Sequence, residues 1–261
     1  MDYNLNDFET ALRKSGIKCN DSVFLTTSLG MLGKPKLKKK FSYKDIAIAL
    51  LKSVKKIVGK NGNIFVPTYS YSFGNEKNIF FLKKSKSKIG SFPNFFLKQK
   101  GCIRSADPMI SIAGIGKKSK EILKTNSYTS YGKNCTFEKF LKVNNLKCCN
   151  VGLGINWMPF IHHLDWINRV PFRYDKFFEG KIIIGKKKKK IKWHYPVRYL
   201  RKEAYPDGYK IGRLALKKGL FHSSKIGRSQ IYVINYKKFF NFAKKLTAKN
   251  KWLTARGPKF K

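Results

Sequence analysis

The stretch LKCCNVGLGINWMPFIHHLDWINRVPFR, residues 146–173, predicts a buried strand, a sharp turn and a helix in succession. The apolar run LKCCNV favours a strand, and Gly152 and Gly154 end it because glycine lets the backbone turn sharply. Pro159 suits the first turn of a helix, where its missing N–H would have no partner anyway. We therefore expect a helix to begin near Pro159, where a sheet ends.

This predicted helix carries two histidines and an acid. Residues three apart share a helical face, so His162 and Asp165 are expected to be neighbours while His163 points elsewhere. A histidine next to an acid that orients it is a reasonable acid–base site. Two adjacent histidines beside an acid are, however, most often a surface polar cluster. A zinc site would need a third ligand, which His194 and His222 do not supply at suitable spacing, so we expect no metal.

Outside this stretch, helices and strands alternate in a way that favours an α/β fold. Ser42 and Asp45 resemble a helix N-cap box before an apolar pattern of helical period. The other expected elements are a helix at Phe8–Ser15, a strand entering a glycine loop at Ser22–Gly30, a turn at Asn61-Gly62, and strands at Ile64–Val66 and Ile231–Asn235. With no repeat and no linker to divide it, the chain is expected to form one domain, residues 1–261.

The composition is that of a globular protein: 261 residues, 42% hydrophobic. No apolar run is long enough to cross a bilayer, and the polar N-terminus resembles no secretory signal. The cysteines are odd in number and irregularly spaced, which favours reduced thiols and a cytoplasmic location. They are Cys19, Cys102, Cys135, Cys148 and Cys149.

The charge is strongly positive, with 57 Lys+Arg against 14 Asp+Glu and a net charge of +43. Such a field favours nucleic acid, anionic membranes or phosphorylated small molecules. However, the lysines are spread along the chain, and the abundance of Asn, Ile, Phe and Tyr indicates AT-rich coding as one source of lysine. The run Lys186–Lys190 is expected at an exposed hairpin tip. No nucleic-acid-binding module is recognisable, so we do not expect nucleic acid as a partner.

Six separated motifs occur in one order along nearly the whole chain. They are SVFLTTSLGMLG, NIFVPTYSYSF, SKIGSF, IRSADPMISIAGIG, YGKNCTFEKFL and FIHHLD. In this order they resemble the aminoglycoside 3-N-acetyltransferase family, which acylates amines from acyl-coenzyme A. The tail RSQIYVINYKKFFNFAKKL…WLTARGP resembles the branch of that family that acts on nucleotide-linked amino sugars.

The resemblance implies a fold, a co-substrate and a set of site residues. The fold would be antibiotic N-acetyltransferase-like, a mixed central α/β sheet flanked by helices, and the co-substrate acetyl-CoA or another acyl-CoA. His162 falls on the family's catalytic histidine and Asp165 on its acidic neighbour. The implied coenzyme-binding residues are Thr27, Ser28, Leu29 and Gly30 on one loop, with Ser87, Lys88 and Gly90 on a second wall. The implied substrate-cleft residues are Arg104, Ser105, Asp107 and Ser111.

The chain also departs from the family pattern. Thr26 stands where many members have histidine, and Asp165 is one methylene shorter than the usual glutamate. Asn94 replaces a glutamate and Leu97 an arginine. The missing acid at Asn94 leaves three explanations open: a sub-branch, a relocated acid such as Glu76, or a weakened enzyme.

The chemistry expected of this site is direct acyl transfer. An amine is mostly protonated at neutral pH and cannot attack a thioester until a base such as His162 takes its proton. Backbone N–H groups, or the hydroxyls of Thr27 and Ser28, are candidates to stabilise the thioester oxygen. Alternatively, these hydroxyls only cap the following helix. The cysteines have no base at a readable spacing, so no acyl-enzyme is expected.

Charge favours one class of amine over another. An aminoglycoside is a polycation and requires acids, of which the chain has few, whereas a nucleotide-linked amino sugar carries phosphates that suit a positive field. We therefore expect an enzyme acylating such a sugar for surface polysaccharide synthesis. Antibiotic resistance through aminoglycoside acetylation is the first alternative, and a non-catalytic, polyanion-binding protein is the second. The oligomeric state is left open, with a homo-oligomer as one outcome.

Overall fold

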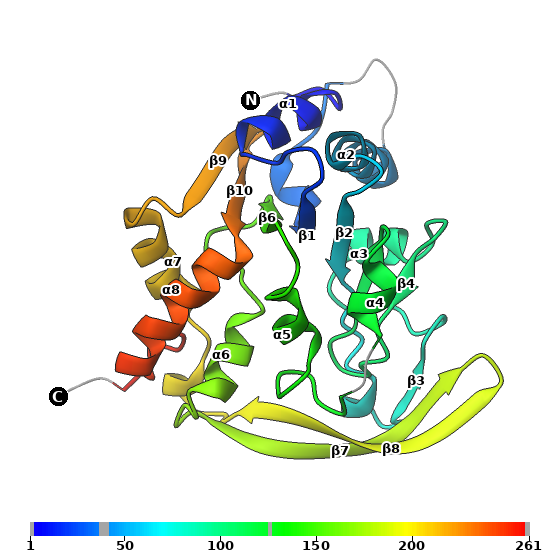
Figure 1. Cartoon of the computed structure of the whole chain (residues 1–261), viewed down its shortest axis with the longest axis vertical. Coiled ribbons are helices and arrows are strands. Elements are labelled where there is room, and N and C mark those ends of the chain that lie inside the picture. The colour runs from blue at the N-terminus through cyan, green and yellow to red at the C-terminus, as the bar shows by residue number, and fades with distance from the viewer. Residues whose placement is uncertain (1–2, 37–41, 125–126, 259–261) are drawn as a thin grey trace.

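Two sheets and the helices around them make up the computed structural model, which describes residues 3–36, 42–124 and 127–258 (Figure 1). The described helices are α1 (Asp7–Lys14), α2 (Tyr43–Val58), α3 (Ser91–Phe96), α4 (Ser119–Leu123), α5 (Thr136–Phe140), α6 (Ile161–Ile167), α7 (Gly208–Lys217) and α8 (Tyr236–Lys249). The described strands are β1 (Ser22–Thr27), β2 (Asn63–Pro67), β3 (Ile79–Phe81), β4 (Ile103–Arg104), β5 (Ile112–Ile115), β6 (Leu146–Val151), β7 (Arg173–Ile184), β8 (Lys187–Arg198), β9 (Phe221–Ile226) and β10 (Ser229–Asn235).

The larger sheet is mixed and has the strand order β4-β5-β2-β1-β6-β10-β9. Its three central strands, β2, β1 and β6, are parallel, and the strands outside them pair antiparallel. Each central strand is almost wholly buried, which explains why their sequences are apolar runs without alternation. The predicted mixed α/β fold is confirmed.

Alternate residues of these strands enter two different cores. Phe24 packs among residues from α4, α5, α6 and α8 on one face of the sheet. Its neighbours Val23 and Leu25 pack with α1, α2 and α3 on the other face. Helices therefore cover both faces, and the carboxyl ends of β1, β2 and β6 share one edge, where ligands bind in such sheets.

The smaller sheet has the order β3-β7-β8 and consists mainly of a long hairpin (Figure 1). The prediction that Lys186–Lys190 form its tip was wrong in detail. Gly185 and Lys186 connect the strands, whereas the other four lysines belong to β8 and pair with residues of β7. On the inner side of the hairpin, Trp193 packs into the core that contains α5 and α8. Ile182 of β7 and Ile191 of β8 pack into the same core, so the two strands continue past Trp193 toward the lysines.

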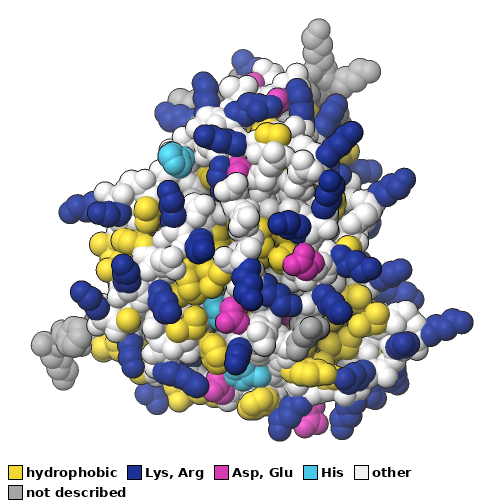
Figure 2. Space-filling model, viewed as in Figure 1, with side chains coloured by type: hydrophobic (Ala, Val, Ile, Leu, Met, Phe, Trp, Pro, Cys, Tyr) yellow, Lys and Arg dark blue, Asp and Glu magenta, His cyan; other side chains and the backbone are white. Residues whose placement is uncertain are grey.

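Several local predictions are confirmed. Ser42 and Asp45 form a reciprocal capping box at the start of α2. Pro159, expected in the first turn of a helix, instead lies just before α6, which begins at Ile161 after the N-cap residue Phe160. All five cysteines are described and carry free thiols. No described helix is both long enough and apolar enough to span a membrane. Figure 2 shows lysines and arginines spread over the visible face rather than gathered at one end.

Candidate active site

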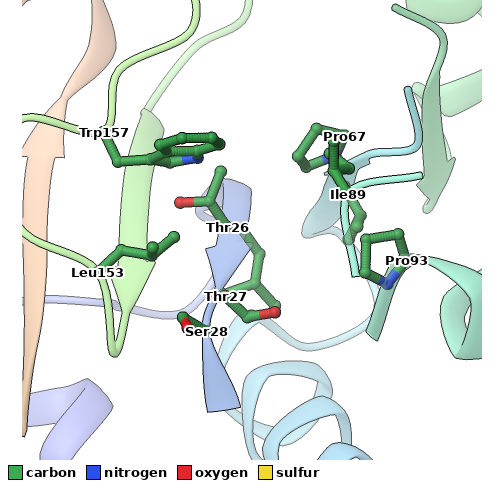
Figure 3. Close-up of a pocket in the computed structure, with 10 residues that line it drawn as sticks. Thr26, Thr27, Ser28, Pro67, Ile89, Pro93, Leu153 and Trp157 are labelled. Atoms are coloured by element: carbon green, nitrogen blue, oxygen red, sulfur yellow. The ribbon is translucent and has the colours of Figure 1, made fainter. Parts of the chain in front are cut away.

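A cavity of about 270 Å³ lies at the carboxyl ends of β1 and β2, beside the loop that follows β6. Figure 3 shows Thr26, Thr27 and Ser28 between two apolar walls, with Trp157 and Leu153 on one side and prolines on the other. The lining residues are Leu25, Thr26, Thr27, Ser28, Val66, Pro67, Ile89, Pro93, Leu153 and Trp157. Of the predicted coenzyme loop, Thr27 and Ser28 face this cavity, whereas Leu29 is buried in the core and Gly30 is exposed.

The wall containing Trp157 is held by a buried polar network. The Thr26 hydroxyl donates to Asn150 Oδ1 at 2.6 Å, and Asn150 Nδ2 donates to the carbonyls of Gly154 and Trp157. Gly152 is required here: its φ is +71°, and a Cβ would lie 2.4 Å from the carbonyl oxygen of Ser28. Thr26, which replaces a family histidine, thus helps to position the loop after β6.

Asn94 holds the opposite wall. Its Oδ1 accepts from the Ser87 backbone N–H, and its Nδ2 donates to the carbonyls of Ser87 and Gly90. The loop pinned in this way separates two cavities. Ile89 lines the cavity beside Ser28. Lys88 lines an open cavity of about 630 Å³, which is also lined by Lys77 and Lys86. Ser87 itself is buried and Gly90 is exposed.

His162 and Asp165 lie together on α6, as their spacing predicts. His162 Nδ1 is 3.1 Å from Asp165 Oδ2, and the edge of the histidine ring packs against Tyr131. Arg173, the first residue of β7, contacts both: its Nε donates to Asp165 Oδ2 at 2.8 Å, and its Nη2 lies 2.5 Å from His162 Nδ1. Thr254 donates to the other carboxylate oxygen at 2.5 Å. Asp165 is thus a buried acceptor with three partners within the protein.

Asp165 and Arg173 compete for one atom of His162. If Nδ1 carries the proton, it donates to Asp165 and leaves Nε2 free to act as a base; if Arg173 donates to Nδ1, the proton moves to Nε2. Burial and the positive Arg173 lower the pKa of His162, which Asp165 opposes. Burial opposes ionisation of Asp165, but the hydrogen bond from His162 and the charge of Arg173 lower its pKa. At neutral pH the pair is therefore a carboxylate beside a neutral imidazole.

Arg173 and Thr254 were missed by sequence reasoning. Arg173 ends the stretch quoted first, eight residues after Asp165, and its basic side chain was a signal that went unused. Thr254 lies 89 residues from Asp165, and nothing in the local sequence connects the two. Only the packing of the C-terminal segment against α6 brings this hydroxyl to the carboxylate.

His163 points away from this cluster into the core, as expected. Its Nδ1 lies 2.5 Å from the Tyr131 carbonyl, so it donates there, and its ring packs against Trp166 and Phe240. Cys135 Sγ lies 3.6 Å from the same nitrogen, but that nitrogen carries the proton donated to Tyr131 and is therefore no base for the thiol. Burial raises the pKa of Cys135 to about 12, which keeps the thiol neutral and unreactive.

The four predicted substrate-cleft residues are buried and bonded to protein atoms. Arg104 donates to Ser111 Oγ and to the carbonyls of Thr68, Leu82 and Ser85. Ser105 Oγ accepts from the Ile112 N–H. Asp107 accepts from the N–H groups of Met109 and Ile110, and burial raises its pKa to about 6. None of the four lines the cavity beside Ser28. In this structure they brace the exit of β2.

Glu76, the acid considered as a replacement for the one missing at Asn94, lines the open cavity with Lys77, Lys86 and Lys88. His162 instead takes its carboxylate from Asp165. Within the described residues, no group of three or more His, Cys, Asp or Glu side chains is placed to hold a metal ion.

A histidine on α6 that contacts a buried carboxylate, together with a cavity at the carboxyl edge of a mixed α/β sheet, is the arrangement expected of a candidate acid–base active site. The chain belongs to the aminoglycoside 3-N-acetyltransferase family, whose model matches residues 36–248. It is an acyltransferase of that family. No curated protein sequence matches the chain.

Solved structures of the family share the fold. The aminoglycoside acetyltransferase AAC(3)-Xa superposes with a TM-score of 0.81 at 14% identity, covering 95% of this chain and 93% of that one. AAC-VIa bound to sisomicin gives 0.79 at 18% identity, covering 95% and 99%. AAC-IIIb in a binary complex with CoASH gives 0.78 at 14% identity, covering 95% and 97%. At these identities the likeness concerns the fold.

Proposed function

We propose that residues 1–261 form an acyl-CoA-dependent N-acyltransferase domain that acylates a primary amine of a nucleotide-linked amino sugar, with His162 as general base. The observation that carries the proposal is the contact of His162 Nδ1 with the buried Asp165 carboxylate at 3.1 Å. The proposal requires the tautomer in which Nδ1 donates to Asp165 rather than accepting from Arg173, so that Nε2 is free, and the lowered pKa of His162 keeps the imidazole neutral at working pH.

The reaction balances without a covalent enzyme intermediate. His162 Nε2 takes a proton from the substrate amine as its nitrogen attacks the thioester carbon. The C–S bond then breaks, and the departing thiolate of the coenzyme receives the proton from the imidazolium. Asp165 stabilises the transient imidazolium, while Arg173 keeps Asp165 ionised and limits how basic the imidazole becomes.

The walls beside Ser28 suit an acyl-CoA. The narrow cavity is mainly apolar and would hold the uncharged arm that carries the thioester, with the hydroxyls of Thr27 and Ser28 available to donate to its oxygen. Across the loop pinned by Asn94, Lys77, Lys86 and Lys88 line a cavity that would take coenzyme phosphates. AAC-IIIb, a structural relative, binds CoASH.

Charge supports an anionic acceptor. AAC-VIa, a relative, binds the aminoglycoside sisomicin. Such polycations require free carboxylates, whereas the buried carboxylates of Asp165 and Asp107 already accept hydrogen bonds from protein groups. With a net charge of +43, the surface favours a substrate bearing phosphates. Aminoglycoside acetylation is the second candidate because the chain belongs to that family, and polyanion binding without catalysis is the third.

The location proposed is the cytoplasm, where acyl-CoA is made and thiols stay reduced, and the five free cysteines support it. The absence of a metal cofactor remains a prediction.

A thiol-release assay tests the proposal. Purified protein and acetyl-CoA are mixed with amino-sugar nucleotides or, separately, with aminoglycosides, and free coenzyme A is measured. Release with the sugar nucleotides alone supports the proposal. Release with aminoglycosides alone keeps the acyltransferase and refutes the charge argument. Salt-sensitive binding of polyanions without any thiol release would favour the non-catalytic alternative.

A further inference from the structure

Of the nine arginines in the chain, Arg173 contacts His162, and three more lie on the segments that continue from this contact. Arg173 contacts His162 directly, and its Cα is paired with that of Arg198 in the β7–β8 register. Paired Cα atoms in an antiparallel ladder are about 4.5–5.5 Å apart. On the other side, Thr254 donates to Asp165, and Arg256 follows two residues later. Two independent segments therefore carry arginines from the catalytic pair to the adjacent surface.

Tyrosines hold these arginines in place. The guanidinium carbons of Arg198 and Arg256 lie 4.2 and 5.1 Å from the centroid of the Tyr205 ring. Arg201 lies 5.4 Å from the centroid of Tyr199. The backbone supports the arrangement, because the Arg256 N–H donates to the Tyr205 carbonyl. A guanidinium stacked on an aromatic ring loses less freedom on binding an anion than a free side chain does.

Within the described part of the chain, Arg198, Arg201 and Arg256 have no carboxylate partner. Other arginines do: Arg13 pairs with Glu9 and Arg169 with Asp175. The nearby acids are Asp207, whose carboxylate accepts from the Tyr209 N–H, and Glu203, whose carbonyl accepts from the Gly257 N–H. Neither forms an ion pair with the three arginines within the described residues. Three positioned, unpaired guanidiniums beside a catalytic histidine form a receptor for a doubly charged, multi-oxygen anion.

We propose that the patch formed by Arg198, Arg201 and Arg256 binds the diphosphate of a nucleoside diphosphate carried by the acceptor substrate. This inference rests on the proposed function and supplies its missing specificity site. Two residues span at most about 7 Å, so Arg256 lies within a sugar's reach of the Asp165–His162 pair. The lysine-lined cavity beside Lys88, on the other wall, remains for the coenzyme. The diphosphate would therefore bind on the side of α6 where Thr254 contacts Asp165.

Binding of uridine diphosphate, measured by calorimetry at 150 mM salt, tests the patch without catalysis. The double variant Arg198→Gln/Arg256→Gln should bind it at least tenfold more weakly, since charge-assisted hydrogen bonds are lost. Arg201→Gln, an exposed single change, should give a smaller loss in the same direction. The control Lys44→Gln/Lys52→Gln removes the same charge from α2 and should change the affinity less than twofold. Uridine without phosphates should not bind, and thermal midpoints verify folding of each variant.

Three results overturn the proposal. Equal weakening by the arginine and lysine variants would reduce the patch to the general positive field. Competition of uridine diphosphate with acetyl-CoA, with parallel losses for both ligands in the arginine variants, would assign the patch to the coenzyme. Absence of uridine diphosphate binding by the wild type would remove the site altogether.

The failure of this site and that of the proposed function are separable. If the enzyme releases coenzyme A in the presence of sugar nucleotides and the double arginine variant keeps a normal KM for them, the proposed function stands and the patch is refuted. If the patch binds the diphosphate but no sugar nucleotide is acylated, the patch stands and the function fails. The joint expectation is a raised KM for the sugar nucleotide in the double variant, with kcat nearly unchanged.

Discussion

Replacing His162 and His163 separately distinguishes the proposed general base from its neighbour. His162→Ala removes the proton acceptor, and general-base assistance is typically worth about 10²–10⁴ in rate, or about 2.7–5.4 kcal/mol of activation free energy. The cavity that would hold the coenzyme arm is lined by Thr27 and Trp157 but not by His162, so the affinity for acetyl-CoA should stay within about twofold of wild type. The expected result is therefore a fall in kcat with little change in coenzyme binding.

His163→Ala should have the opposite pattern. The side chain is 1% exposed, packs between aromatic rings and donates to the Tyr131 carbonyl, so its loss leaves a cavity and an unpaired carbonyl. Such a change costs about 2–4 kcal/mol of unfolding free energy. Thiol release per folded molecule should remain near wild type, while the thermal midpoint falls.

The two variants are compared by kcat from thiol release, acetyl-CoA affinity from calorimetry, and the thermal midpoint. Near-normal kcat in His162→Ala refutes the assignment of the base. Equal losses of kcat in both variants, measured on folded protein, would show that the contacts of α6 do not separate the roles of these histidines.

Three further predictions concern charges and loop contacts. Arg173→Met removes a positive charge that lowers the pKa of His162. The acidic limb of the kcat/KM profile should then move to higher pH, because His162 is protonated more readily. The control Arg169→Met should leave this limb in place. Asn94→Asp removes the N–H donors to the Ser87 and Gly90 carbonyls. The loosened loop should raise the KM for acetyl-CoA about tenfold, with kcat little changed. An unaltered KM contradicts the role given to Asn94. Burial raises the pKa of Asp107 from 3.8 to about 6, so its ionisation lowers the free energy of unfolding as the pH rises through that window. Between about pH 4 and pH 7.5, the free energy of unfolding of Asp107→Asn in urea should therefore rise by up to about 3 kcal/mol relative to that of wild type. A difference between the two proteins that does not change with pH contradicts the assignment.

The sequence predicted the parts of the fold that depend on short-range patterns. Apolar runs without alternation indicated the buried strands β1 and β6, and the Ser42–Asp45 spacing indicated the start of α2. The prediction placed the hairpin connection too far along the chain. Near the connection β8 has lysines on both faces, and its core residues, such as Trp193, come only further along the strand. Charge alone did not reveal where the strand began.

The candidate site was predictable only where its residues are close in sequence. His162 and Asp165 share a helical face, so their three-residue spacing was sufficient to pair them. Thr254 contacts Asp165 from a segment 89 residues further along the chain, and Arg173 contacts it from strand β7 of the smaller sheet. Such contacts depend on how α6, β7 and the C-terminal segment pack, which no local pattern encodes.

The departures from the family pattern acquire a common physical explanation in the structure. Asn94 donates two hydrogen bonds to backbone carbonyls, which an ionised glutamate has no N–H to make. Thr26 donates to Asn150, whose amide then holds the loop carrying Trp157. Both substitutions thus belong to networks in which amides position the two walls of the cavity. Neither network includes His162, whose acid is supplied by Asp165, so the changed residues favour a sub-branch with differently held loops over a weakened enzyme.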